Sequence, residues 1–322
     1  MKRLMKTVTV VGAVLMAVAF SACAAVTRNN AAEKAVTQKS TNMRLSALKD
    51  SIHSFTDDYE AEIGVALITD NGDTVVVNNE NKYPLMSVFK LHQAVALCHD
   101  LEKAGRSLDT VLSIPRSSLN PDTWSPMLKE HTGDTIKLPV RELLRYTLMQ
   151  SDNNASNLLF RQFTSVKETD AFIASLIPRR SFRLVYDEEE MSADHRKCYS
   201  NSSSPLGVAI LLGRLYTDSV IGTDNQDFIC RTLRECKTGT DRIVAPLQSQ
   251  KGVTVGHKTG SGFRENGILA AHNDAAFITY GDGRHYTLVV LVKDFHGDET
   301  AAAGAIARIS AAVYRALSRS SY

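Results

Sequence analysis

The sequence predicts a mixed α+β fold, in which an antiparallel sheet of about five strands is flanked by helices from both chain ends. Three observations predict it. Hairpin signals occur near both ends of the 322-residue chain, amphipathic helical patterns lie outside them, and helical periodicity fills the middle. With 43% hydrophobic and 22% charged residues, the chain can bury a sizeable core.

The N-terminus indicates an export signal at 1–23. Three basic residues lie within the first six, and the apolar run at 8–20 is shorter than the roughly 20 residues that span a bilayer. The run ends in Phe-Ser-Ala-Cys, which is similar to a bacterial lipobox with Phe20 in place of the usual leucine, and this predicts a lipid anchor on Cys23. The alternative is cleavage at small residues, which releases a periplasmic protein.

The next segments predict a tether, a helix and a hairpin. The small, polar stretch at 24–41 is typical of a flexible tether. Apolar residues then recur at helical spacing and predict an amphipathic helix over 41–57. Two β-branched runs, 63–69 and 74–77, flank Asp-Asn-Gly-Asp and predict a β-hairpin.

The C-terminal part repeats this pattern in reverse order. Runs at 275–280 and 286–292 flank Gly-Asp-Gly and predict a second hairpin, and the segment 300–317 has the wide apolar stripe of a helix. We therefore expect 42–85 and 238–322 to form one sheet-and-helix domain.

The middle of the chain, 86–237, is predicted to be an inserted all-α subdomain. Loops rich in Pro, Ser and Asp separate four helical patterns, at 88–101, 140–149, 154–163 and 206–216. Clefts between domains commonly bind small ligands, so we expect the active site at the seam.

The net charge and the cysteine spacing indicate which kinds of binding site and cross-link the sequence does not support. A net charge of +2 with interspersed acids and bases gives little support for nucleic-acid binding. After Cys23, four cysteines allow three disulfide pairings, but free thiols are favoured: Cys98, Cys198, Cys230 and Cys236. Cys230 and Cys236 fall in a segment predicted to be helical, which would hold them about 9 Å apart. No zinc-ligand spacing occurs, and no metal or cofactor is predicted.

Three short motifs carry the chemistry: Ser87-Val88-Phe89-Lys90, Ser151-Asp152-Asn153 and Lys258-Thr259-Gly260. A serine three residues before a lysine shares its helix face, so the lysine can activate the hydroxyl. That spacing alone should occur by chance on the order of once in such a chain. The ordered set is the signature of class A β-lactamases and penicillin-binding proteins.

From about residue 42 to residue 317, the chain resembles the class A β-lactamases, with its closest likeness to the CfxA and PER type of extended-spectrum cephalosporinase. The resemblance implies the β-lactamase/transpeptidase-like fold and a preference for cephalosporins. It also implies that Ser87 attacks the lactam carbonyl and that the N–H groups of Ser87 and Ser261 hold the oxyanion. Pro84 favours an extended lead-in, so Ser87 should lie near a helix N-terminus; an N-cap serine is the alternative.

The resemblance assigns roles to the other two motifs. Ser151 would pass a proton to the departing nitrogen, and the Asn153 amide would bond the substrate and Lys90. Asp152 would order the loop, although Ser-Asp-Asn is also typical of a helix-capping turn. Lys258, Thr259 and Ser261 would bind the substrate carboxylate, with Gly260 letting the substrate approach the strand edge.

Two further residues are candidates for the pocket. Arg242 stands where many members of the family have a second cation facing the carboxylate; the alternative is a surface arginine. Trp124-Ser125-Pro126 resembles the segment that forms one wall of the family's pocket, but the single tryptophan could equally be core.

Deacylation needs a base that activates water. The acidic run at 187–190 precedes Met191-Ser192, and the family pattern Glu-x-x-apolar-Asn selects Glu188 as the base. Ser192 replaces the asparagine that helps to hold the water, and its hydroxyl offers fewer hydrogen bonds. A solvated loop is the alternative for this run.

These features predict an exported, monomeric serine β-lactamase that binds a small β-lactam and confers antibiotic resistance. Either Lys90 or Glu188 could be the base for acylation. The rival predictions are a penicillin-binding D-Ala-D-Ala peptidase, which would lack the deacylating glutamate, and a β-lactam sensor that stays acylated.

Overall fold

The computed structural model describes residues 39–318. The predicted export signal at 1–23, including Cys23, and the predicted tether up to residue 38 lie outside this range. A helix covers 39–57, so the last residues assigned to the tether, 39–41, are helical instead. Within the described range, no helix combines the length and apolar character that a bilayer crossing requires.

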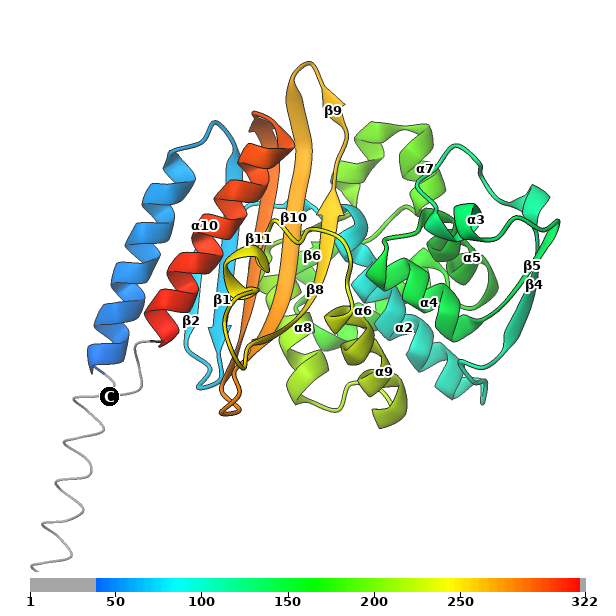
Figure 1. Cartoon of the computed structure of the whole chain (residues 1–322), viewed down its shortest axis with the longest axis horizontal. Helices are drawn as coiled ribbons and strands as arrows, with labels where there is room; N and C mark the ends of the chain where they lie inside the picture. The colour runs from blue at the N-terminus through cyan, green and yellow to red at the C-terminus, as the bar shows by residue number, and fades with distance from the viewer. Residues whose placement is uncertain (1–38, 319–322) are drawn as a thin grey trace, which may run out of the picture. The chain divides into compact units, whose positions relative to one another are not determined.

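The main sheet is antiparallel and is built from both ends of the chain (Figure 1). Its order is β2-β1-β11-β10-β8, and the short β9 pairs with β10. Both predicted hairpins are present, as β1–β2 and β10–β11, and β1 pairs with β11. This confirms the predicted mixed fold. The strands are β1 (Glu62–Thr69), β2 (Thr74–Val77), β8 (Thr254–Ser261), β9 (Arg264–Glu265), β10 (Ile268–Thr279) and β11 (His285–His296).

Helices cover both faces of this sheet. The predicted C-terminal helix is α10 (Glu299–Ser318), which packs on β10 and β11, and α8 (Pro205–Thr217) packs on the other face (Figure 1). Because both faces are covered, β10 is buried along nearly its whole length. The prediction began this strand at residue 275, since the residues from Ala270 to Asp274 are alanine, histidine, asparagine and aspartate and include no β-branched residue.

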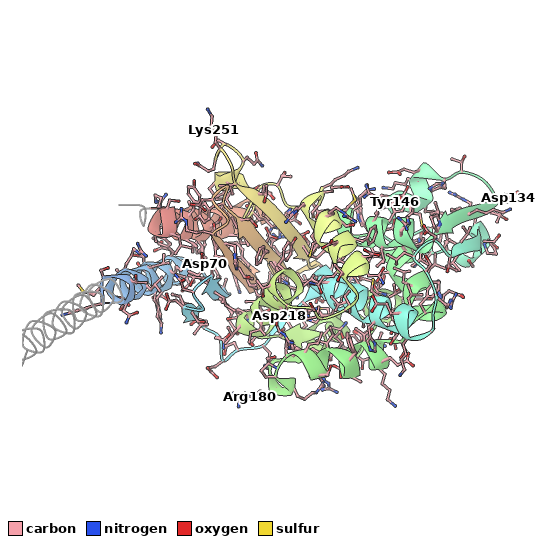
Figure 2. The ribbon with its side chains drawn as sticks, turned by 90° about the horizontal axis from the view of Figure 1, so that it is seen from below. Asp70, Asp134, Tyr146, Arg180, Asp218 and Lys251 are labelled. Atoms are coloured by element: carbon pink, nitrogen blue, oxygen red, sulfur yellow. The ribbon has the colours of Figure 1, made fainter. Side chains whose placement is uncertain are left out.

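The helical part is centred on α2 (Phe89–Lys103), which is buried on almost every side because other helices surround it. Figure 2 marks the helical side with Tyr146 and the sheet side with Lys251, in the loop before β8. All four predicted helices of this part are present. The others around α2 and α8 are α3 (Pro126–Glu130), α4 (Val140–Met149), α5 (Asn153–Gln162), α6 (Val166–Leu176), α7 (Glu188–Ala193) and α9 (Thr223–Arg234).

The all-α description of this part is wrong in detail, because short strands occur between the helices. β4 (Val111–Pro115) pairs with β5 (Thr135–Pro139), and a second small sheet joins β3 (Tyr83–Pro84), β7 (Ser202–Ser203) and β6 (Phe182–Arg183). The helical assignment of Cys236 is also wrong, since α9 ends at Arg234. All four cysteines of the described range are free thiols.

Candidate active site

Ser87 lies in a short 3-10 helix, η1 (Met86–Val88), that leads directly into α2. It is therefore at a helix N-terminus, as predicted, where the first N–H groups have no acceptor within the helix. The preceding residue, Met86, has a φ of 46°, in the left-handed region that non-glycine residues rarely adopt. Such backbone strain is typical of functional sites.

The Lys90 amine joins Ser87 to the Ser-Asp-Asn motif and to Glu188. It donates to Ser87 Oγ at 3.1 Å, and it forms an ion pair of 2.8 Å with Glu188. It also donates to the Ser151 carbonyl at 2.8 Å and to Asn153 Oδ1 at 2.6 Å. The Lys90 side chain is 0% exposed and that of Glu188 is 11% exposed, so these charges are held close together away from bulk water.

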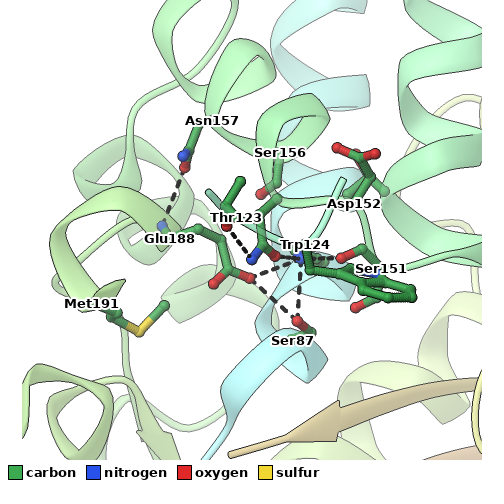
Figure 3. A network of polar contacts seen from close by, with 12 residues as sticks. Ser87, Thr123, Trp124, Ser151, Asp152, Ser156, Asn157, Glu188 and Met191 are labelled. Atoms are coloured by element: carbon green, nitrogen blue, oxygen red, sulfur yellow. Dashed lines mark hydrogen bonds and ion pairs between the residues drawn. The ribbon is translucent and has the colours of Figure 1, made fainter. Parts of the chain in front are cut away.

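Glu188 is the acidic residue of the 187–190 run that reaches Ser87. Ser87 Oγ donates to Glu188 Oε1 at 3.2 Å, and Figure 3 shows the Glu188 carboxylate directed at Ser87. Glu188 begins α7, so the alternative of a solvated loop is wrong. Glu189 points elsewhere and pairs with Arg161 at the surface.

The Ser-Asp-Asn motif forms the turn before α5. Asp152 caps this helix by accepting from Ala155 N at 2.8 Å, and it also accepts from Ser125 Oγ and Met127 N, which ties the turn to α3. The capping and loop-ordering interpretations therefore both hold. Burial raises the pKa of Asp152 although these hydrogen bonds oppose the shift. Ser151 has a φ of 60°, so it is the second non-glycine residue of this site in the left-handed region.

Lys258 approaches the site from β8. Its amine donates to Ser151 Oγ at 3.0 Å and to the carbonyl of Thr259 at 2.9 Å. The residue is 1% exposed, and burial lowers the pKa of the Lys258 amine to about 7.

The edge of β8 faces the nucleophile. β8 ends the sheet, and Gly262 N donates to Ala271 O, so the neighbouring Ser261 turns its N–H away from β10 and toward the open edge. A Cβ on Gly260 would come within 2.5 Å of the Leu85 carbonyl and 3.2 Å of Ser87 N. The approach of η1 thus requires a glycine at position 260, and the expectation that Gly260 lets a substrate lie against the strand edge stays a prediction.

Arg242 is not the surface residue of the alternative interpretation, because it is only 6% exposed. It donates to Ser261 Oγ at 2.6 Å and to the carbonyls of Asn273 and Gly260 at 2.7 and 3.2 Å. Burial lowers the pKa of Arg242, while nearby carboxylates oppose the shift. Its guanidinium therefore stabilises the end of β8 through the hydrogen bonds to Gly260 and Ser261.

A cavity of about 570 Å³ lies over these groups, within the range of small-molecule sites. Trp124 is one of its walls; at 55% exposed it is not a core residue, and its indole N–H donates to the Gln150 carbonyl. The predicted residues on the wall are Ser87, Trp124, Ser151, Asn153, Glu188, Ser192, Thr259 and Ser261. The other predicted residues each contact one of these from behind: Lys90, Lys258, Gly260 and Arg242.

The sequence interpretation missed two polar residues that position this site. Asn157 Oδ1 accepts from the Glu188 N–H at 3.2 Å, and Thr123 Oγ1 accepts from Asn153 Nδ2 at 2.9 Å (Figure 3). Asn157 follows Asn153 by four residues and so shares its helix face, a signal present in the sequence. Thr123 meets Asn153 only through the fold and has no comparable signal.

This geometry can be compared with known proteins. The model of the β-lactamase enzyme family matches residues 47–317, which is most of the chain. The chain belongs to this family. A β-lactamase of Phocaeicola vulgatus is 56% identical over 290 residues, 89% of this chain and 90% of that protein.

More distant relatives identify the class. The extended-spectrum β-lactamase PER-1 of Pseudomonas aeruginosa is 30% identical over 269 residues, 83% of this chain and 86% of that protein. The crystal structure of a class A β-lactamase from Bacteroides cellulosilyticus matches with a TM-score of 0.81 at 31% identity, covering 86% of this chain and 99% of that chain. The protein is a class A serine β-lactamase, and it hydrolyses β-lactams.

A second cavity of this β-lactamase, of about 650 Å³, lies between the end of α2 and α9. Arg141 pairs with Asp109 at its wall, and Glu102 accepts from the Gly222 N–H. Its walls include no member of the three motifs. Within residues 39–318, no group of three or more His, Cys, Asp or Glu side chains is arranged to hold a metal ion.

Proposed function

We propose that this β-lactamase acylates on Ser87 and releases the acyl group with water activated by Glu188. The observation that supports this most directly is the position of Ser87 Oγ, 3.1 Å from the Lys90 amine and 3.2 Å from the Glu188 carboxylate. A nucleophile beside two groups able to take its proton meets the requirement for acyl transfer.

In the acylation step, Ser87 Oγ attacks the lactam carbonyl carbon. Its proton passes to Glu188, or to Lys90 after the Lys90 ammonium has given a proton to Glu188 across their 2.8 Å ion pair. The C–N bond then breaks, and Ser151 gives its hydroxyl proton to the departing nitrogen. Ser151 Oγ regains the proton that Ser87 released through the Lys90 amine, which contacts the same residue. Ser151 suits this role because its Oγ is 3.0 Å from Lys258 Nζ and its residue is held at the cavity wall.

The backbone N–H groups of Ser87 and Ser261 would hold the oxyanion. Ser87 offers an N–H of a first helical turn, and Ser261 offers an N–H at the open edge of β8. The substrate carboxylate would meet the hydroxyls of Thr259 and Ser261, with the charge of Lys258 behind them and Arg242 holding Ser261 in place. Asn153 and Trp124 would contact the rest of the substrate.

Deacylation requires Glu188 to take a proton from water as the water attacks the ester carbon. The proton then passes from Glu188 to Ser87 Oγ, 3.2 Å away, as the bond between this oxygen and the acyl carbon breaks. Ser192 lies one helical turn after Glu188 on α7 and lines the same cavity, so its hydroxyl would help to hold this water. Asn157 fixes the backbone of Glu188 through its N–H.

We further propose a preference for cephalosporins and a role in antibiotic resistance, which the resemblance to extended-spectrum enzymes supports. Export by the N-terminal signal, a lipid anchor on Cys23, a monomeric state and a site at the seam of the two predicted domains complete this proposal.

Turnover of a chromogenic cephalosporin by the purified protein tests the proposal. We expect many equivalents of product per enzyme, none with Ser87→Ala, and a lower kcat/KM for a penicillin measured in parallel. Product limited to one equivalent would instead indicate a protein that stays acylated and would overturn the deacylation step. A higher kcat/KM for the penicillin would overturn the cephalosporin preference alone.

A further inference from the structure

Asn273 is a buried asparagine in the middle of β10 whose side chain bonds the segment before the nucleophile. Its Nδ2 donates to the carbonyls of Pro84 and Leu85 at 2.8 and 3.2 Å. Its Oδ1 accepts from the N–H of Val292 on β11 at 3.0 Å. Because the carbonyls can only accept and the N–H can only donate, these partners decide which end of the amide faces which neighbour. The residue is 0% exposed, so these three hydrogen bonds hold its side chain away from water.

The two carbonyls that Asn273 bonds precede a strained turn. Met86, with its φ of 46°, stands between Leu85 and Ser87. A residue in the left-handed region keeps that conformation only where the surrounding contacts fix it. The Leu85 carbonyl belongs to the peptide unit that joins Leu85 to Met86, so the hydrogen bond from Asn273 fixes one side of this turn. The next peptide unit carries the Ser87 N–H, and its orientation follows from that of the turn.

Asn273 also contacts the strand that carries the second N–H of the proposed oxyanion site. In the pairing of β10 with β8, Asn273 lies opposite Gly260. Arg242 Nη1 donates to the Asn273 carbonyl at 2.7 Å and to the Gly260 carbonyl at 3.2 Å. The Gly260 carbonyl and the Ser261 N–H are the two ends of one peptide unit. The side chain of Asn273 thus holds the turn at the nucleophile, and its backbone holds the end of β8.

The separation of these two segments matters for the reaction. Oxyanion-hole donors stabilise the transition state when they lie about 2.7–3.1 Å from the position that the oxyanion will occupy. A Cβ on Gly260 would come within 2.5 Å of the Leu85 carbonyl, so the glycine allows η1 and β8 to approach closely. Asn273 bonds the same Leu85 carbonyl from β10 and so limits how far the two segments can move apart.

We infer that Asn273 is a positioning residue of this enzyme, which sets the separation between the Ser87 N–H and the Ser261 N–H. The inference rests on the proposed role of these two groups in holding the oxyanion. Asn273 does not line the cavity, so it acts through its neighbours and not through contact with the substrate.

The test removes the side-chain donors at position 273 while keeping its approximate volume. Asn273→Asp keeps the acceptor for the Val292 N–H, but a carboxyl group can donate at most one hydrogen bond, and only when it is protonated. Asn273→Leu removes the donors and the acceptor together. Asn154→Leu is the matched control, because Asn154 is 1% exposed and bonds the backbone of Asn120 through both ends of its amide.

Displaced donors should stabilise the oxyanion less and leave substrate binding largely intact, so kcat should fall while KM changes little. Removing one oxyanion-hole donor typically lowers kcat about 10²–10³-fold, so we expect a displaced donor to lower kcat about 10-fold in Asn273→Asp and up to about 10²-fold in Asn273→Leu. Both constants are measured with the chromogenic cephalosporin, alongside the melting temperature of each variant. Asn154→Leu should lower the melting temperature without a comparable fall in kcat. If Asn273→Leu does not fold, Asn273→Asp still tests the inference because it keeps the bond to Val292.

The infrared carbonyl stretch of the acyl group on Ser87 tests the donor positions without relying on turnover. Hydrogen bonds to an ester carbonyl lower its stretching frequency, and the adduct should accumulate in a Glu188→Gln background. Adding Asn273→Asp or Asn273→Leu to that background should raise the frequency, and adding Asn154→Leu should not.

Two failures of this test can be told apart. If the Glu188→Gln adduct with Asn273 intact showed the frequency of an ester without hydrogen bonds, the oxyanion role of the two N–H groups would be contradicted, and the inference with it. If that frequency were lowered but neither Asn273 substitution changed it or kcat, the inference alone would be overturned. A fall in melting temperature with unchanged kcat and frequency would likewise reduce Asn273 to a structural residue.

Discussion

Lys90 and Lys258 are two buried lysines that both donate to Ser151, yet their surroundings differ. Lys90 Nζ bonds the Ser151 carbonyl and has the Glu188 carboxylate at 2.8 Å. Lys258 Nζ bonds the Ser151 hydroxyl, and within residues 39–318 no carboxylate oxygen lies within 4.0 Å of it. One lysine thus has its counter-ion inside the protein, and the other does not.

The difference separates two roles for positive charge in this site, one within an ion pair and one without a carboxylate partner. Lys90 and Glu188 neutralise each other next to Ser87, so protons can move among them without net charge entering the cavity. Lys258 lacks a carboxylate partner, and its burial is a cost that an anionic substrate would offset. We therefore propose that Lys90 acts in the chemical steps and that Lys258 acts in substrate binding.

The largest effect is expected for Lys90→Met, which keeps the length of the side chain but removes the amine. The change deprives Ser87 of a hydrogen-bond partner and leaves Glu188 without its ion pair. We expect kcat for the chromogenic cephalosporin to fall on the order of 10⁴-fold. If Lys90→Met only raised KM, the distinction between the two lysines would be lost.

The next largest effect is expected for Glu188→Gln, which removes the carboxylate opposite Lys90. Turnover should fall on the order of 10²–10³-fold because the water loses its general base. Intact-mass spectra should then show an acyl adduct on Ser87. Glu189→Gln is the matched control, since Glu189 follows on α7 but pairs with Arg161 at the surface. Rapid turnover without an adduct in Glu188→Gln would contradict the role of Glu188.

The sequence predicted the parts of the fold that have strong local signals. Both hairpins contain β-branched runs around Gly and Asp turns, and α10 has a continuous apolar stripe. The β4–β5 pair was missed because its strands are short, only partly buried and separated by a long connection. The helix α6 was missed although Ser165 and Glu168 form a capping box, a signal that was available.

The residues of the site likewise fall into those with a local sequence signal and those without one. Ser87 and Lys90 share one helix turn, and Lys258 and Thr259 are adjacent, so short motifs could indicate them. Contacts of the motifs with distant residues, such as that of Asn153 with Thr123, depend on loops brought together by packing. The burial of Arg242 and the contact of Gly260 with Ser87 depend on how η1 meets the edge of β8, which no local pattern encodes.

A smaller effect, on binding, is expected for Lys258→Met. Loss of a charge-assisted interaction of about 1.5–3 kcal/mol should raise KM roughly 10-fold to 100-fold, with less change in kcat. Lys251→Met is the control, since Lys251 is exposed in the loop before β8.

The same comparison predicts a pH dependence for the wild type. Lys258 is cationic below its pKa of about 7 and neutral above it, while the substrate carboxylate stays negative. KM should therefore be lowest below pH 7 and should rise as pH increases through that value. Lys258→Met should lack this rise, and a rise of equal size in that variant would assign the titration to another group.

The smallest effect is expected for Arg242→Lys, which keeps the charge near Lys258 but cannot reproduce the guanidinium fork. Arg242 donates to Ser261 Oγ at 2.6 Å and to the Asn273 carbonyl at 2.7 Å, and a lysine can reach at most one of these with good geometry. Loss of one hydrogen bond of about 1 kcal/mol corresponds to a roughly fivefold rise in KM. Arg264→Lys, on the exposed β9, is the control. If Arg242→Lys matched Lys258→Met in size, Arg242 would have to bind the carboxylate directly, and Lys258 would no longer be the single cation assigned to binding.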